Sequence, residues 1–200
     1  MKSKFAAIVR ATLLLMSAIM MTTTAAAQTA AVLLDQTYTN TQCGITIMYP
    51  SDWVKEELNQ KFGEGGLAPL TSLANFEPNS PEDYKSTVKA EAWDISKYSD
   101  KSIEGIADVD KETILSGEYA GSIEQAERTT VNGHHAYSIV YTQPIPDSEE
   151  IWKIMATYIV SGDMQYTILF TTTDNETFDK YISVVDSMVN SIKLDEGKKC

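Results

Sequence analysis

Residues 44–53 read Gly-Ile-Thr-Ile-Met-Tyr-Pro-Ser-Asp-Trp, a stretch that joins a strand of strict alternation to an abrupt stop. Ile45, Ile47 and Tyr49 fall on one face at period two, as in a half-buried strand. Pro50 has no N–H for a sheet ladder, and the next two residues form a turn that leads Trp53 back toward the core. The stretch therefore predicts a strand over 45–49 and a second strand over 54–58.

The residues that follow predict further strands and two helices. Strands are expected over 70–76, 86–95, 123–131, 134–141, 151–160 and 164–172, with a glycine-rich surface loop over 63–66. Apolar residues recur at helical spacing over 102–115, and Gly117 stands at the C-cap position. A second amphipathic helix follows Thr173, which has capping-box spacing with Glu176. The pattern is that of one α+β domain.

The strand pattern also predicts a sheet that is covered on both faces. Within 86–95, Val88, Ala90 and Ala92 share one face, whereas Trp93 lies on the other face with Lys89 and Glu91. A tryptophan on a nominally polar face is explained if that face is covered too.

Two hairpins are expected in the second half of the chain. Asn132-Gly133 suits a type I′ turn, because both central residues of that turn need positive φ. For the next hairpin, a loop of residues 161–163 would place both apolar sets on one buried face. This register pairs Val160 with Met164, Tyr158 with Tyr166 and Ile154 with Phe170.

The N-terminal segment predicts export. Lys2 and Lys4 precede an apolar run over 11–21, and small residues follow as far as Ala27. We interpret residues 1–27 as a signal peptide cleaved after Ala27, which makes the protein secreted or extracytoplasmic. An uncleaved N-terminal membrane anchor is the alternative, although the run is about half the ~20 residues that span a bilayer.

The charge of the secreted part restricts its partners. Removing residues 1–27 takes away three basic residues and leaves 13 Lys and Arg against 28 Asp and Glu, a formal charge of −15. Nucleic acids and anionic lipid headgroups require concentrated positive charge. We therefore expect no nucleic-acid binding and no direct anionic-lipid binding, and the acidity suits cations or a basic partner.

Two cysteines are present, at Cys43 and at Cys200. An oxidising compartment allows them to pair, and the bridge would close nearly the whole domain. In the other interpretation, which the sequence favours, Cys43 is a small core residue and Cys200 a free thiol on a flexible tail over 195–200.

The order of these elements resembles the PsbP-like family. The resemblance rests on residues 44–53, on Val-Asn-Gly-His-His-Ala-Tyr over 131–137, and on the closing hairpin and helix. It implies a PsbP-like domain over 37–194, preceded by a short leader over 28–36, and an α-β-α sandwich around a central antiparallel sheet. It also implies extracytoplasmic accessory proteins, of which the best known is an extrinsic photosystem II subunit that helps retain calcium and chloride. The leader lacks chloroplast transit features, so the chain looks like a secreted prokaryotic member.

Candidate site residues are few. Asp108, Asp110 and Glu112 alternate like the start of a calcium loop, but Thr113 and Tyr119 replace the glycine and glutamate that such a loop needs. A second acidic cluster is Asp147, Glu149 and Glu150. Both clusters are weak candidates for calcium or manganese and are better explained as solvated surfaces. Asn175 starts an N-glycosylation pattern.

The preferred functional hypothesis is a non-catalytic binding or assembly module that docks to an extracytoplasmic protein or membrane-protein complex, with weak divalent-cation binding left open. The alternative is an extracytoplasmic enzyme that uses His135 and nearby carboxylates at a sheet edge. His134 and His135 are adjacent, so their side chains leave opposite faces of the ribbon and do not readily grip one metal. The chain has no Gly-x-Ser-x-Gly nucleophile elbow, which favours the first hypothesis.

Overall fold

The computed structural model describes residues 32–63, 69–83, 85–116 and 119–200. The predicted signal peptide, most of the glycine-rich loop and Gly117 lie outside these residues. The elements follow one another as β1 (Gln36–Asn40), β2 (Ile45–Tyr49), β3 (Trp53–Phe62), β4 (Leu70–Pro78), β5 (Thr87–Asp94), α1 (Ile103–Ser116), β6 (Ser122–Val131), β7 (His134–Pro144), β8 (Ile151–Ser161), β9 (Met164–Thr172), α2 (Asn175–Asn190) and β10 (Lys193–Leu194). No helix of the described residues is long and apolar enough to cross a bilayer.

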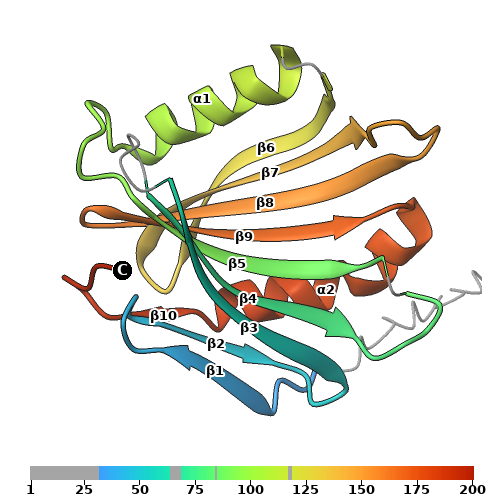
Figure 1. Cartoon of the computed structure of the whole chain (residues 1–200), viewed down its shortest axis with the longest axis horizontal. Coiled ribbons are helices and arrows are strands. Elements are labelled where there is room, and N and C mark those ends of the chain that lie inside the picture. The colour runs from blue at the N-terminus through green and yellow to red at the C-terminus, as the bar shows by residue number, and fades with distance from the viewer. Residues whose placement is uncertain (1–31, 64–68, 84, 117–118) are drawn as a thin grey trace, which may run out of the picture. The chain divides into compact units, whose positions relative to one another are not determined.

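Seven strands form a central antiparallel sheet in the order β3-β4-β5-β9-β8-β7-β6. A smaller sheet has the order β1-β2-β10. Figure 1 shows α1 and α2 on opposite sides of the central sheet. The predicted α+β sandwich is therefore confirmed, with the small sheet as an addition to it.

The stretch over 44–53 folds as its pattern predicts. Ile45 and Ile47 are buried in β2, which stops at Pro50, and the Trp53 N–H donates to the Pro50 carbonyl at 3.1 Å to close the turn. Trp53 then begins β3 and packs edge-on against Tyr181 of α2. However, β2 belongs to the small sheet, so the turn at Pro50 carries the chain from one sheet to the other.

Each face of the central sheet has its own apolar core, because the strands alternate between two covered faces. The first face, called here the α2 face, packs against α2 and the small sheet, and its largest buried side chains include Phe76, Tyr166 and Phe170. The second, the α1 face, packs against α1 through a smaller cluster that includes Ile106, Ile139 and Tyr158. Burial on both faces explains the position of Trp93, as the sequence predicts.

The hairpin at Asn132-Gly133 is confirmed. β6 and β7 pair up to Val131 and His134, and both turn residues have positive φ, 48° and 87°. The Asn132 side-chain amide also donates to the carbonyls of Asn190 and Ile192. The turn is thereby tied to the end of α2.

The predicted register of the second hairpin is wrong by one residue. Ser161 pairs with Met164 across a two-residue turn, so Ile159 lies opposite Tyr166 and Tyr158 opposite Thr167. Gly162 takes φ +62° at the first turn position, as type II′ turns require. The prediction placed the alternating set of β8 that includes Tyr158 on the same face as the set of β9 that includes Tyr166, whereas in the structure the first set faces α1 and the second faces α2.

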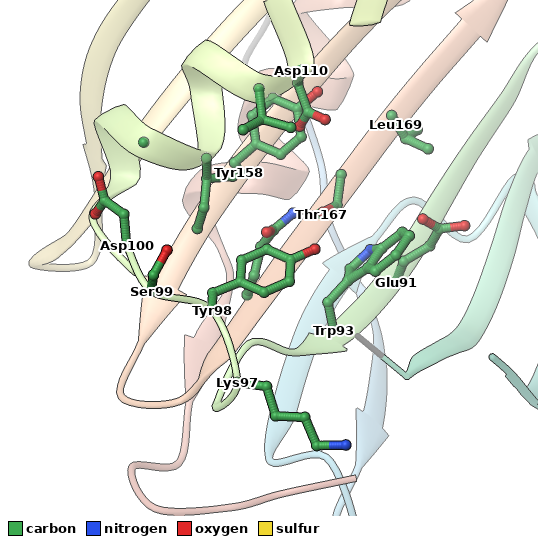
Figure 2. Close-up of a pocket in the computed structure, with 14 residues that line it drawn as sticks. Glu91, Trp93, Lys97, Tyr98, Ser99, Asp100, Asp110, Tyr158, Thr167 and Leu169 are labelled. Carbon is green, nitrogen blue, oxygen red and sulfur yellow. Dashed lines mark hydrogen bonds between the residues drawn. The ribbon is translucent and has the colours of Figure 1, made fainter. Parts of the chain in front are cut away.

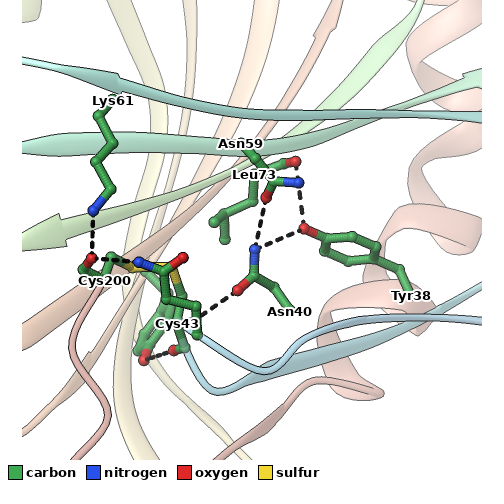
Figure 3. Close-up of a disulfide and its surroundings, with 9 residues drawn as sticks. Tyr38, Asn40, Cys43, Asn59, Lys61, Leu73 and Cys200 are labelled. Atoms are coloured by element: carbon green, nitrogen blue, oxygen red, sulfur yellow. Dashed lines mark hydrogen bonds between the residues drawn. A yellow bond between two sulfur atoms is a disulfide. The ribbon is translucent and has the colours of Figure 1, made fainter.

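The chain end is fastened to the domain. Of the two states left open for the cysteines, the structure contains the bridged one, with Cα atoms 4.5 Å apart (Figure 3). The Cys200 carbonyl accepts hydrogen bonds from Lys61 at 2.6 Å and Gln42 at 2.9 Å. Gly44 has φ +65°, and a Cβ there would collide with Lys198. Residues 195–200, which the sequence predicts as a flexible tail, thus have several fixed contacts.

Candidate functional site

The three candidate carboxylates of α1 are separated by the helix rather than gathered by it. Asp108 is exposed and pairs with Lys111 at 2.6 Å, and Glu112 is exposed as well. Asp110 instead is partly buried and lies beside the Tyr158 ring of the sheet (Figure 2). Burial raises the Asp110 pKa, and the nearby Tyr158 hydroxyl opposes the shift. Of the three carboxylates, Asp110 is therefore the one that faces the sheet rather than the solvent.

The second acidic cluster lies in the connection between β7 and β8. Asp147, Glu149 and Glu150 are exposed, and Glu150 forms an ion pair with Lys85 at 2.8 Å. Within residues 32–63, 69–83, 85–116 and 119–200, no three His, Cys, Asp or Glu side chains are grouped as metal ligands. Calcium or manganese binding stays a prediction.

The histidines lie beside the edge of the central sheet. His134 and His135 begin β7, and His135 is exposed next to a shallow pocket that Glu104 and Arg128 also line. Glu104 forms an ion pair with Arg128 at 3.0 Å, so the carboxylate that lines this pocket with His135 is already engaged. The enzyme hypothesis stays a prediction.

Asn175 is exposed at the first turn of α2, where its side chain accepts a hydrogen bond from Lys153 at 3.0 Å. Its position suits the predicted glycosylation, which stays a prediction.

An acidic groove of about 370 Å³ lies on the α2 face, where α2 leaves the edge of the sheet uncovered. Its floor is apolar and comes from β7, β8 and α2, through Val140, Met155, Phe178 and Ile182. Its rim carries Glu124 and Glu127 from the edge strand β6 and Asp186 from α2. We call this feature the acidic groove.

Two carboxylates of the acidic groove oppose each other. Burial and then the charge of Glu127 raise the pKa of Asp186. Lys153, the basic residue of the groove, pairs with Glu124 at 3.1 Å and lies over the Phe178 ring at 4.8 Å. Glu127 and Asp186 therefore lack compensation from that lysine, and a positive charge placed between them would be stabilised.

A larger cavity of about 720 Å³ lies on the α1 face, between α1, the connection before it and strands β5, β8 and β9. Apolar and aromatic walls come from Trp93, Tyr98, Ile106, Val109 and Leu169. Figure 2 shows the Tyr98 hydroxyl pointing toward the Trp93 indole, with Asp110 beside the Tyr158 ring. We call this feature the α1 cavity.

Sequence reasoning missed both hollows. The acidic groove combines residues of α2 and β6, and the α1 cavity combines residues of β5 and β9, elements that are far apart in the chain. One signal of the α1 cavity is present in the sequence. Within 86–95, Glu91 and Trp93 lie on the same face of a strand whose other face is apolar.

Structural comparisons place the fold among several known proteins. The solution structure of cyanobacterial PsbP (CyanoP) from Synechocystis sp. PCC 6803 matches with a TM-score of 0.57 and 15% identity, covering 80% of this chain and 92% of that one. A mutant of the protein Mog1 matches with a TM-score of 0.54 and 10% identity, over 81% and 96% of the two chains. LpqN of Mycobacterium tuberculosis, described as involved in cell envelope biogenesis, matches with a TM-score of 0.50 and 12% identity, over 75% and 82%.

At these identities the likeness shows a shared fold. A search among curated proteins found no match. The sequence model of the family described as PsbP-like protein matches residues 17–194, which is most of the chain, and the chain therefore belongs to the PsbP-like family.

Proposed function

We propose that the protein is a non-catalytic binding module that acts outside the cytoplasm and docks to a basic segment of an extracytoplasmic protein or complex through the acidic groove. The observation that carries the proposal is the pair Glu127 and Asp186 on the rim of one groove with an apolar floor, where burial and then the charge of Glu127 raise the pKa of Asp186. A lysine or arginine between them relieves that repulsion.

The composition of the groove supports a protein partner. The apolar floor takes the aliphatic part of a basic side chain, and the rim carboxylates take its charge. Among the described strands, β6 pairs with β7 alone and forms an edge of the central sheet, so its outer backbone groups are available to an extended segment. The excess of 28 acidic over 16 basic residues steers a basic partner toward the domain.

The disulfide supports an extracytoplasmic location, because such bonds persist in oxidising compartments. This is consistent with the predicted signal peptide over 1–27, and LpqN offers a structural precedent in a protein described as involved in the cell envelope. A bound calcium or manganese ion is not needed for the docking.

The test is retention of envelope proteins by immobilised protein that lacks residues 1–27. We expect the wild type to retain a basic protein in stoichiometric amount, and the variant E127Q/D186N to lose it. The charge-matched control D108N/E112Q changes two exposed carboxylates of α1 and should retain it. Salt should weaken retention, because the contact is electrostatic.

Equal retention by both double variants would reject the groove as the docking site. A preparation that retains no partner and turns over a substrate only when His135 is intact would favour the enzyme hypothesis instead.

A further inference from the structure

The α1 cavity is a second hollow, on the face of the sheet opposite the acidic groove. α1 packs mainly over β6, β7 and β8, and its residues Ile106, Val109 and Asp110 line the cavity over β5 and β9. The volume of about 720 Å³ falls within the range of pockets that hold small organic molecules.

The floor of the α1 cavity is unusually polar for the centre of a sheet. Glu91 pairs in register with Thr167, and Thr167 pairs with Tyr158, so three polar side chains form one row across β5, β9 and β8. Glu91, Thr167 and the neighbouring Gln165 are 5%, 3% and 7% exposed. Gln165 donates to the Thr167 hydroxyl at 3.0 Å and Glu91 pairs with Lys89 at 2.6 Å, so this polar row is partnered within the protein and forms a polar floor under the α1 cavity.

Trp93 supplies an independent observation. Its indole Nε1 is buried and has no hydrogen-bond partner among the described residues. A buried donor of this kind is rare in native structures. Because Trp93 lines the α1 cavity, a small turn of its indole would present this N–H to an oxygen acceptor on a ligand.

The acidic residues and the aromatic rings of the cavity indicate that the ligand is positively charged. Glu91, Asp100 and Asp110 line the α1 cavity, against Lys97 as a base. Glu91 pairs with Lys89 at 2.6 Å through one oxygen, and Asp110 lies beside the Tyr158 ring. The rings of Trp93, Tyr98 and Tyr158 offer faces that attract an organic cation.

We propose that the α1 cavity binds a small organic ammonium ion with an apolar body and an oxygen acceptor. The ammonium group lies between the aromatic rings and the carboxylates of Glu91 and Asp110, the acceptor meets the Trp93 N–H, and the body lies against Leu169 and Val109. This site is independent of the docking proposed for the acidic groove, so either can fail without the other.

The test uses three probes that share one hydroxyphenyl body and differ in the charge of the head group: tyramine, the neutral alcohol tyrosol, and 3-(4-hydroxyphenyl)propanoate. Calorimetry at pH 7 should show tyramine binding at millimolar concentration or below, with tyrosol weaker by about tenfold and no binding of the anion. No binding of any probe, or equal binding of tyrosol and tyramine, would overturn the proposal.

Matched variants locate the site. D110N should weaken tyramine binding by about tenfold, whereas D108N, on the same helix but exposed, should leave it unchanged. W93F removes the buried donor and should also weaken binding, and W152F, outside the cavity, should not. E91Q should behave like D110N, and D110N keeps the test decisive if E91Q does not fold.

Tyramine binding that D110N and W93F leave unchanged would reject this location. If a lysine-rich peptide binds in a Trp93-dependent way and tyramine does not, the cavity receives a side chain of a partner protein and the small-ligand proposal is wrong.

Discussion

One face of the central sheet packs against α2, the small sheet and the chain end that the disulfide fastens, whereas the other packs against α1 over only part of its width. The burial of alternate residues along the strands shows this difference. On β5, Val88, Ala90 and Ala92 are at most 1% exposed on the α2 face, while Glu91 and Trp93 line the α1 cavity.

The difference separates two tasks. The α2 face has continuous apolar packing across its centre, which supplies stability, and its groove lies only at the edge beside β6. The α1 face places polar groups at the sheet centre, which lowers the gain from burial but provides hydrogen-bonding groups for a ligand. Changes at the centre of the α2 face should therefore alter stability, and changes around the α1 cavity should alter binding.

The sharpest contrast is between two neighbours on β9. Phe170 is fully buried and stacks on Phe178 with ring centroids 5.3 Å apart, while Leu169 points to the α1 cavity. F170A should lower the free energy of unfolding by about 3–5 kcal/mol, and L169A by only about 1 kcal/mol. Urea denaturation measures both, and equal losses would contradict the division between the faces.

Removal of the disulfide should have the next largest effect on the same face. The double variant C43S/C200S should lose about 2–4 kcal/mol, because the bond closes a loop of 157 residues in the unfolded chain. Denaturation of the wild type with and without reductant should reproduce the loss. An unchanged unfolding midpoint would show that the hydrogen bonds of the chain end suffice without it.

Asp83 fastens α2 to the connection before β5. It is 7% exposed and accepts hydrogen bonds from Lys180 and Tyr181, both at 2.7 Å, and these bonds lower the Asp83 pKa. A carboxyl whose pKa is lowered by folding contributes stability above its ordinary value of about 3.9, and this contribution disappears as pH falls through the folded value.

D83N should therefore lose about 1–2 kcal/mol at pH 7 and much less near pH 2. Unfolding measured across this range distinguishes the charge from simple packing, since a packing defect would persist at low pH.

Substitution of Asp186 should change the free energy of unfolding least, and should raise it where the other substitutions lower it. Its pKa is raised by burial and by Glu127, so its ionisation disfavours the folded state as pH rises above the ordinary value. D186N should be more stable than the wild type at pH 7 by at most about 0.5 kcal/mol, and equal to it at pH 3. Thermal melts at low and high salt should show the gain only at low salt, whereas a loss at pH 7 would mean that Asp186 has a stabilising partner.

Local patterns predicted much of the fold. Ile45 and Ile47 with Pro50 gave a strand and its stop, and Asn132-Gly133 gave a hairpin, because these features depend on residues next to one another. The start of α2 was nearly right: the N-cap is Asp174, whose carboxylate accepts from the Thr177 N–H at 2.7 Å, rather than Thr173.

Where both faces of a strand are apolar, the alternation of apolar residues no longer determines which face is which or how the strand is registered. The period-two runs of β8 and β9 predict Tyr158 and Tyr166 on one face, and only the turn at Gly162 decides the register. The α1 cavity lay beyond prediction for a different reason. Glu91 and Thr167 meet only because β5 and β9 are neighbours, and no local pattern determines that order.

The most direct test of the division between the faces is a nuclear magnetic resonance titration that follows the three tryptophan indole N–H signals during addition of tyramine. Trp53 lies in the core of the α2 face, Trp93 in the α1 cavity, and Trp152 outside both. We predict that the Trp93 signal shifts in a saturable way while the Trp53 and Trp152 signals stay in place. An unmoved Trp93 signal, or equal shifts of all three, would contradict the assignment of binding to the α1 face.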